Sequence, residues 1–296
     1  MNQTEIALLT RARRDFHRFL IESGTLSIAE TAQGRVASNA DKSQASSKNV
    51  ALHIAEQLEV PVGTKSAGQT AGTKFELATN NFLAATFPLL QAVRPGTWEV
   101  MNLGNRRRHD HFADYEPYRH LADLADAIAL DSSLAAALGN SYVISPDVIV
   151  VRSAVADVEI NADQYIVDEF AGRLSPLRAD NFAGDPTKFI HAVVSCKWTM
   201  RSDRAQNTRA EALNLLKNRK GRAPHIVAVT GEPSLSRIAS LALGTGEIDM
   251  VYHAFLPELR TAIEQVGTED AQELFHILVD GNRLRDIADL PLDLAV

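Results

Sequence analysis

Three residues whose types together suit phosphate-ester chemistry stand in the second half of the chain: Asp147, Lys197 and Glu211. Magnesium ions bind carboxylate oxygens and fill the rest of their shell with water and substrate phosphate oxygens. A lysine beside such an ion orients the attacking water or offsets the charge that develops on the phosphate. The residue types therefore favour metal-assisted hydrolysis. A purely structural ion pair between Asp147 and Lys197 is an equally open interpretation at this stage.

The elements that must position these residues can be read from the hydrophobic pattern. Residues 190–194 form an apolar run with β-branched character, which predicts a buried strand that ends at Lys197. The next segment is rich in good helix formers. A helix there would bring four polar residues close to one face, because they follow three- and four-residue steps: Arg201, Arg204, Thr208 and Glu211.

Asp147 follows Pro146 inside the apolar run 142–151, which has the composition of a strand. Proline breaks a ladder hydrogen bond and belongs at a strand edge or a bulge. An acid beside that break, between apolar flanks, is predicted to be buried. A buried carboxylate needs a cation or hydrogen-bond donors. Lys197 is one candidate for that partner.

The segment from Lys197 to Arg222 is strongly basic in an acidic protein. It holds eight Lys or Arg against two acids, which is a local charge of +6. The rest of the chain therefore carries −13, which gives the net charge of −7. Such a segment indicates either an anionic partner or a solvated helix face. The overall negative charge argues against non-specific binding along nucleic acid. Any contact with a polyanion must therefore be confined to a local, complementary surface.

The rest of the chain predicts an α/β fold with a central mixed β-sheet flanked by helices, in one domain over residues 1–296. Helices are expected at 4–22, 48–58 and 115–138, a polar surface loop at 34–49, and a strand at 164–170. The one cysteine, Cys196, excludes an internal disulfide and suits a reducing cytoplasm. No apolar run approaches the ~20 residues of a membrane span, so no membrane partner is expected.

Several motifs together resemble the PD-(D/E)xK nuclease superfamily. They are PD at 146–147, SCK at 195–197, and RSDR at 201–204 followed by Glu211. Within it they are similar to the branch of type II restriction endonucleases that cut at CCGG, in which a serine, here Ser195, replaces the usual acid before the lysine. The missing carboxylate then comes from the following helix. Further segments such as GQTAGTKFE and NRKGRAPHIV extend the resemblance over nearly the whole chain.

The resemblance implies a role for each residue of the catalytic group. Asp147 and Glu211 would ligate Mg²⁺, together with the backbone carbonyl of Cys196, and Lys197 would position the attacking water. Ser195 would line the same site, and Glu76 matches an early acid of the family. Taken alone, Glu76 is better explained as a carboxylate that is favoured near a helix N-terminus. Cys196 as a nucleophile is the weaker alternative, because no partner base stands near it in the sequence.

The resemblance also implies which residues read DNA. Arg201 and Arg204 would each take a guanine, and Asp203 would accept from cytosine amino groups. This agrees with the donor and acceptor pattern of the major groove. The outer base pair would be contacted by Gln69 and Arg237, with Asp41 and Ser43 at the minor groove or the same pair. For Asp41 and Ser43, a plain surface loop is the alternative.

The resemblance therefore implies a Mg²⁺-dependent type II restriction endonuclease that cuts duplex DNA at a palindrome containing CCGG, with GCCGGC as the expected site. A palindrome requires two-fold symmetry, hence at least a homodimer, and the resemblance implies a homotetramer. A restriction-modification system also implies a cognate DNA methyltransferase in the same cytoplasm. Two alternatives stay open: a non-catalytic sequence-specific DNA-binding protein, and a less specific DNA-repair nuclease.

Overall fold

The computed structural model describes residues 6–32, 34–63, 68–103, 112–130, 146–181, 187–200, 202–244 and 246–296. Their main feature is a seven-stranded sheet with the order β3-β5-β6-β7-β8-β9, in which β4 also pairs with β6. Its strands are β3 (Trp98–Asn102), β4 (Tyr115–Glu116), β5 (Val148–Ser153), β6 (Lys188–Lys197), β7 (His225–Thr230), β8 (Met250–His253) and β9 (Leu284–Asp286). The pairs β3–β5 and β5–β6 are antiparallel and the pairs from β6 to β9 are parallel, which confirms the predicted mixed sheet.

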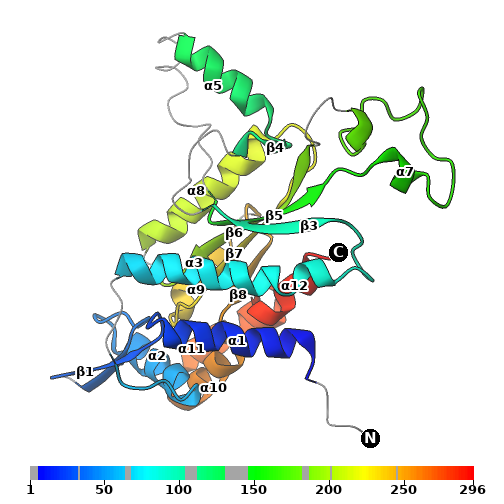
Figure 1. Ribbon diagram of the computed structural model, residues 1–296. Helices are drawn as coiled ribbons and strands as arrows, with labels where there is room; N and C mark the ends of the chain where they lie inside the picture. Colours follow the sequence, from blue (N-terminus) through cyan, green and yellow to red (C-terminus); the bar gives the residue numbers. More distant parts are fainter. Residues whose placement is uncertain are drawn as a thin grey trace, which may run out of the picture.

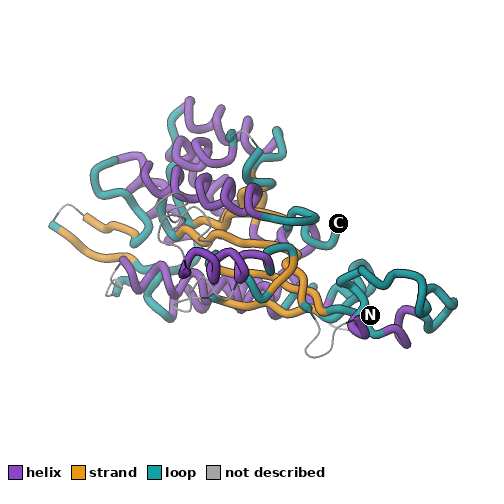
Figure 2. Tube along the Cα trace, turned by 90° about the horizontal axis from the view of Figure 1, so that it is seen from above, coloured by secondary structure: helices purple, strands orange, loops and turns teal. Residues whose placement is uncertain are grey.

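Helices cover both faces of the sheet (Figures 1 and 2). One face packs against α1 (Leu8–Glu22) and α3 (Gly68–Ala84), and the other against α8 (Ser202–Asn218). Successive side chains of a strand point to opposite faces. Accordingly Val148 and Val150 of β5 belong to the core on the α1/α3 side, while Ile149 and Val151 belong to the core on the α8 side.

The remaining helices surround the far half of the sheet and its ends. They are α2 (Ala45–Gln57), α5 (His120–Leu130), α7 (Asp157–Ile160), α9 (Leu235–Ala242), α10 (Leu256–Val266), α11 (Glu269–Asp280) and α12 (Leu290–Asp293). A two-stranded ribbon of β1 (Ile28–Thr31) and β2 (Gly34–Ala37) projects beside α2 (Figure 1). No described helix is both long and apolar enough to cross a membrane. The assignment of residues 1–296 to one domain stays a prediction.

The topology places the start of β5 and the end of β6, two central strands, side by side. This end of the two strands is called the sheet edge below. Strands β5 and β6 are antiparallel, with Val148 opposite Val194. The residue before β5 is Asp147 and the last residue of β6 is Lys197. Both strands are buried over most of their length, as expected for strands covered on both faces. Because the two strands pair in this register, Asp147 and Lys197 lie close to each other.

Three sequence-based expectations need correction. Residues 164–170 are not a strand but an irregular segment, in which the Asn161 carboxamide oxygen accepts the backbone N–H groups of Ile166 and Val167. The expected loop 34–49 contains β2 and the start of α2. The expected helix 115–138 begins as strand β4 beside Lys188 and becomes helix α5 only at His120. Residues 131–138 lie outside the described part.

Candidate functional site

Asp147 and Lys197 are in direct contact at the sheet edge. The Asp147 Oδ2 atom accepts a hydrogen bond from Lys197 Nζ at 3.2 Å and another from the backbone N–H of Cys196 at 2.8 Å. The Asp147 side chain is 5% exposed and that of Lys197 18%. Burial acts to lower the pKa of Lys197, but the carboxylates of Asp147 and Glu211 outweigh it and raise that pKa. The predicted cation for the buried acid is thus present.

Glu211 approaches this edge from helix α8. It lines a small cavity of about 20 Å³ together with Pro146, Ser195 and Thr208. A space of this volume holds one water-sized particle. The Ser195 hydroxyl oxygen is buried there and has no hydrogen-bond partner in the described part of the chain. The register explains the grouping, because Ser195 and Lys197 are two residues apart on β6 and so face the same side.

The residues present fit a hard divalent cation. Carboxylate oxygens and a hydroxyl are the donors that such an ion prefers. Within the described ranges, no group of three or more His, Cys, Asp or Glu side chains could hold a metal ion. The predicted set contains only the two carboxylates of Asp147 and Glu211, so its other ligands would be a backbone carbonyl, water and substrate phosphate.

Glu76 reaches the region from the opposite layer. It lies on α3, and its charge is felt by the Cys196 thiol, which faces that side of the sheet. Burial, followed by the charges of Asp147 and Glu76, raises the pKa of Cys196. A buried thiol that keeps its proton is a poor nucleophile. The structure therefore gives no support to the alternative in which Cys196 attacks a substrate.

The predicted readers of the central base pairs fall largely beyond what the structure describes. Arg201 lies outside the described residues. Asp203 and Arg204 occupy the first turn of α8, and Gln69 the first turn of α3, but their side chains are outside the described part. The backbone nevertheless starts α8 five residues after Lys197. The RSDR segment is thus attached to the same edge of the sheet as Asp147.

Three predicted contacts to the outer base pair form one cluster. Arg237 of α9 pairs through Nη2 with the carboxylate of Asp41. The other Asp41 oxygen accepts from the Ser43 hydroxyl at 2.6 Å and from the Ser43 backbone N–H at 2.8 Å. These hydrogen bonds, then the Arg237 guanidinium, lower the pKa of Asp41 to about 2. Residues far apart in the sequence are thereby joined in a charged surface group.

Sequence reasoning missed Glu232, which joins this cluster to the RSDR segment. Its side chain is fully buried, and Oε2 accepts the backbone N–H of Met200 at 2.7 Å. Arg237 donates through Nη1 to the carbonyl oxygen of Met200 at 3.0 Å. The only sequence signal was an acid in the Gly-Glu-Pro turn directly after a buried strand.

A wider cavity lies at the other end of the sheet. Its volume is about 320 Å³, and its lining includes four cationic side chains, those of Arg94, Arg152, Lys220 and Arg222. Arg152 stands opposite Phe189 at the start of β6. Eight residues of extended strand separate Phe189 from Lys197, about 25 Å. Cavity size therefore does not identify the chemical site in this protein.

Comparison with known proteins gives a consistent result. The family model described as NgoMIV restriction enzyme matches residues 16–296. The chain is 49% identical over 290 residues to the type II restriction enzyme NgoMIV of Neisseria gonorrhoeae, covering 98% of this chain and 99% of that protein. Among solved structures, the type IIF restriction endonuclease Bse634I with cognate DNA covers 84% of this chain and 99% of its own, at 12% identity and a TM-score of 0.38. That structural likeness is too low to add to the assignment.

Proposed function

Because the chain belongs to the NgoMIV restriction enzyme family, we propose that it is a type II restriction endonuclease that uses Mg²⁺ to cut both strands of duplex DNA at GCCGGC. One observation carries the chemical part of this proposal. The buried carboxylate of Asp147 contacts the ammonium of Lys197 at the sheet edge where the polar side chains of Glu211 and Ser195 line one small, otherwise mainly apolar cavity. Family membership supports site-specific cleavage, and this cluster supplies groups for a hydrolytic step.

The roles of the residues follow from their chemistry. Asp147 and Glu211, with the backbone carbonyl of Cys196, would hold the ion, which supplies Lewis-acid stabilisation of the phosphate when bound. Lys197 orients the attacking water and offsets negative charge on the phosphate oxygens. Ser195 adds a hydroxyl beside Glu211 in the same cavity. In-line attack by that water on the phosphorus leaves a 5′-phosphate and a 3′-hydroxyl.

We assign recognition of the DNA sequence to two groups of residues. Arg201 and Arg204 each bind a guanine, and Asp203 accepts from cytosine amino groups, because these are the side chains that match those bases in the major groove. Gln69, Arg237, Asp41 and Ser43 contact the outer base pair or the adjoining minor groove.

A palindromic site implies a two-fold assembly. The chain would act as at least a homodimer, and as a homotetramer if two sites are bound together. The enzyme would work in the cytoplasm beside a methyltransferase that protects the host's own sites. The presence of Asp147, Glu211 and Lys197 disfavours a non-catalytic DNA-binding protein. Membership of a type II restriction enzyme family disfavours a less specific repair nuclease.

Incubating the purified protein with a plasmid that carries two GCCGGC sites tests the proposal. Two discrete fragments should form with Mg²⁺ and none with a chelator, and a matched plasmid with both sites altered should stay intact. Retarded but uncut DNA would indicate a binding protein instead. Nicks spread over both plasmids would indicate a less specific nuclease.

A further inference from the structure

The peptide of Met200, directly before the RSDR segment, is held on both of its polar groups. Its N–H donates to the Glu232 carboxylate and its carbonyl accepts from Arg237. Met200 itself is fully buried. The chain thus leaves strand β6 and enters the predicted central reader through a residue that cannot rotate without breaking two hydrogen bonds.

Glu232 is itself rigidly held. Its backbone N–H donates to the Thr230 hydroxyl at 3.1 Å, and its carbonyl oxygen accepts from Nε2 of His253 at 3.0 Å. Its second carboxylate oxygen accepts the N–H of Ser234 at 3.0 Å. Each carboxylate oxygen therefore has a backbone donor. Burial raises the pKa of Glu232, against which these donors and Arg237 favour the ionised form.

The turn that carries Glu232 also touches the other elements of the reading surface. A Cβ on Gly231 would lie 2.5 Å from the Trp198 ring, so the close contact with the β6 exit depends on glycine there. The Asn39 carboxamide donates to the Gly231 carbonyl at 2.8 Å. Asn39 begins the short segment that continues to Asp41. One turn therefore fixes the start of the central reader and the segment that holds the outer-pair cluster.

We propose that Glu232 is a positioning residue for sequence recognition, which holds the Met200 peptide, directly before the predicted central reader, in register with the outer-pair cluster of Arg237, Asp41 and Ser43. The inference rests on the proposed function. Reading bases by hydrogen bonds tolerates displacements of only about half an ångström. Two reading groups from different elements therefore need a rigid common support. Glu232 lies within hydrogen-bond reach of Met200 and 3.7 Å from Arg237 Nη1, so it serves both groups without touching DNA.

The direct test is Glu232→Gln. Glutamine keeps the shape but has one acceptor oxygen, so the N–H of Met200 or that of Ser234 loses its partner. We expect kcat/KM for a GCCGGC duplex to fall about tenfold, the size of one unpaired buried group. Discrimination against a duplex with one changed outer pair should fall by about tenfold as well. Hydrogen exchange of the Met200 amide should accelerate in the absence of DNA.

Glu258→Gln is the matched control. Glu258 is likewise a shielded carboxylate that pairs with an arginine, Arg13, but it lies away from the reading surface. This variant should melt at a lower temperature and keep the wild-type discrimination ratio. Unchanged discrimination or unchanged Met200 exchange in Glu232→Gln, with wild-type enzyme that cuts GCCGGC, would overturn the inference. A wild-type enzyme that does not cut this site would instead refute the proposed function, while the exchange experiment would still report on the anchor.

Discussion

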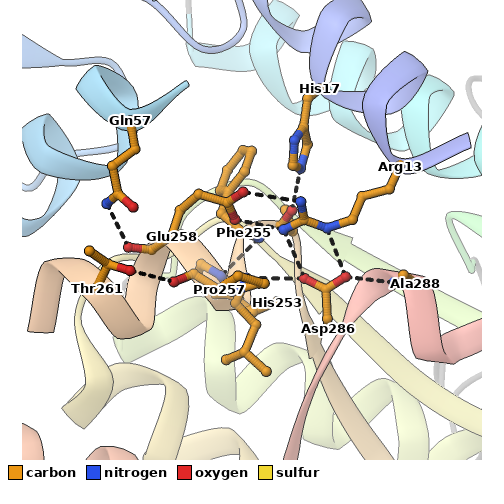
Figure 3. A network of polar contacts seen from close by, with 12 residues as sticks. Arg13, His17, Gln57, His253, Phe255, Pro257, Glu258, Thr261, Asp286 and Ala288 are labelled. Atoms are coloured by element: carbon orange, nitrogen blue, oxygen red, sulfur yellow. Dashed lines mark hydrogen bonds and ion pairs between the residues drawn. The ribbon is translucent and has the colours of Figure 1, made fainter. Parts of the chain in front are cut away.

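Two shielded charge clusters in this molecule each combine one cation with an aspartate and a glutamate, and they differ in their surroundings. In the first, Arg13 of α1 donates to both Glu258 oxygens, at 3.0 and 2.6 Å, and to both Asp286 oxygens, at 2.9 and 3.1 Å (Figure 3). Asp286 also accepts the backbone N–H groups of Leu256 and Ala288. Every oxygen of these two carboxylates is thus paired within the protein.

The second cluster lies around Asp147, Lys197 and Glu211. It borders a cavity with room for one water-sized particle, and the buried Ser195 hydroxyl has no partner in the described part of the chain. A charge cluster that serves the fold pairs its groups with one another, because an unpaired buried polar group costs free energy. A cluster that takes part in a reaction keeps polar groups that can bind water, a metal ion or substrate. We infer that the first cluster stabilises the fold and propose that the second serves catalysis.

The largest expected effect is on activity, from Asp147→Asn. The carboxamide oxygen can still accept the N–H of Cys196, and the Glu211 charge still acts on Lys197, so the fold should persist. Loss of the negative charge should reduce cleavage by roughly 10³-fold or more, because a hard cation binds weakly to a carboxamide. Single-turnover cleavage of a GCCGGC duplex measures this, and a melting curve close to wild type is the control. Near-normal activity would place the chemistry elsewhere.

Arg13→Met should lower the stability of the protein and leave its cleavage activity unchanged. It leaves two shielded carboxylates without their cation, a change that costs about 3–5 kcal/mol of unfolding free energy. Urea denaturation followed by circular dichroism measures the loss. Cleavage per folded molecule should stay at the wild-type level when assayed below the melting temperature. A large loss of activity in a folded Arg13→Met protein would contradict the purely stabilising role of the Arg13 cluster.

Acid should weaken the protein through buried histidines. Burial lowers the pKa of His253, which lies beside the Arg13 cluster, to about 4, and that of His191 to about 4. These two histidines bind a proton near pH 6.5 in the unfolded chain and only near pH 4 in the folded chain. Their contribution to the unfolding free energy is therefore complete above pH 6.5 and falls as the pH is lowered toward 4. One pKa unit is worth about 1.4 kcal/mol. The fall in unfolding free energy between pH 6.5 and 4 should therefore reach a few kcal/mol.

Urea titrations at several pH values measure this slope. His191→Gln serves as the comparison, because glutamine can still donate toward the Leu294 carbonyl that His191 contacts at 2.6 Å but does not titrate. The variant should lose part of the slope. A slope identical to that of wild type would show that His191 does not contribute.

The smallest effect is expected from Glu76→Gln. Glu76 influences the Cys196 thiol from the α3 side, whereas Asp147 and Glu211 are the carboxylates whose charges raise the pKa of Lys197. A supporting rather than a ligating acid should cost about tenfold in single-turnover rate, a typical size for one lost interaction with a charged group. A loss as large as that of Asp147→Asn would make Glu76 an equal member of the catalytic cluster.

The sequence was sufficient to predict that Asp147 and Lys197 meet, because both strands carry strong hydrophobic patterns. A buried run that ends in Lys197 and another that starts after Asp147 can pair in few ways, and the antiparallel register brings their ends together. The mixed sheet follows from the same runs. By contrast, the segment 164–170 has strand-like composition, but the Asn161 side chain captures its backbone donors.

Glu232 could not have been singled out from the sequence. Its importance comes from tertiary contacts with Met200 and Arg237, and one acid in a turn has no periodicity. The ion pair of Arg237 with Asp41 was likewise not predicted, although each residue had been named as a contact to DNA. Local patterns report which elements form, whereas these contacts depend on how distant elements are packed.

The central claim is that the Asp147 cluster and its attached readers form one site-specific nuclease, and sequencing the ends of digested genomic DNA tests it most directly. With Mg²⁺, wild-type protein should leave ends that carry a 5′-phosphate and all fall within GCCGGC, and Asp147→Asn should leave none above background. Ends scattered over unrelated sequences, or equal cutting by Asp147→Asn, would contradict the account.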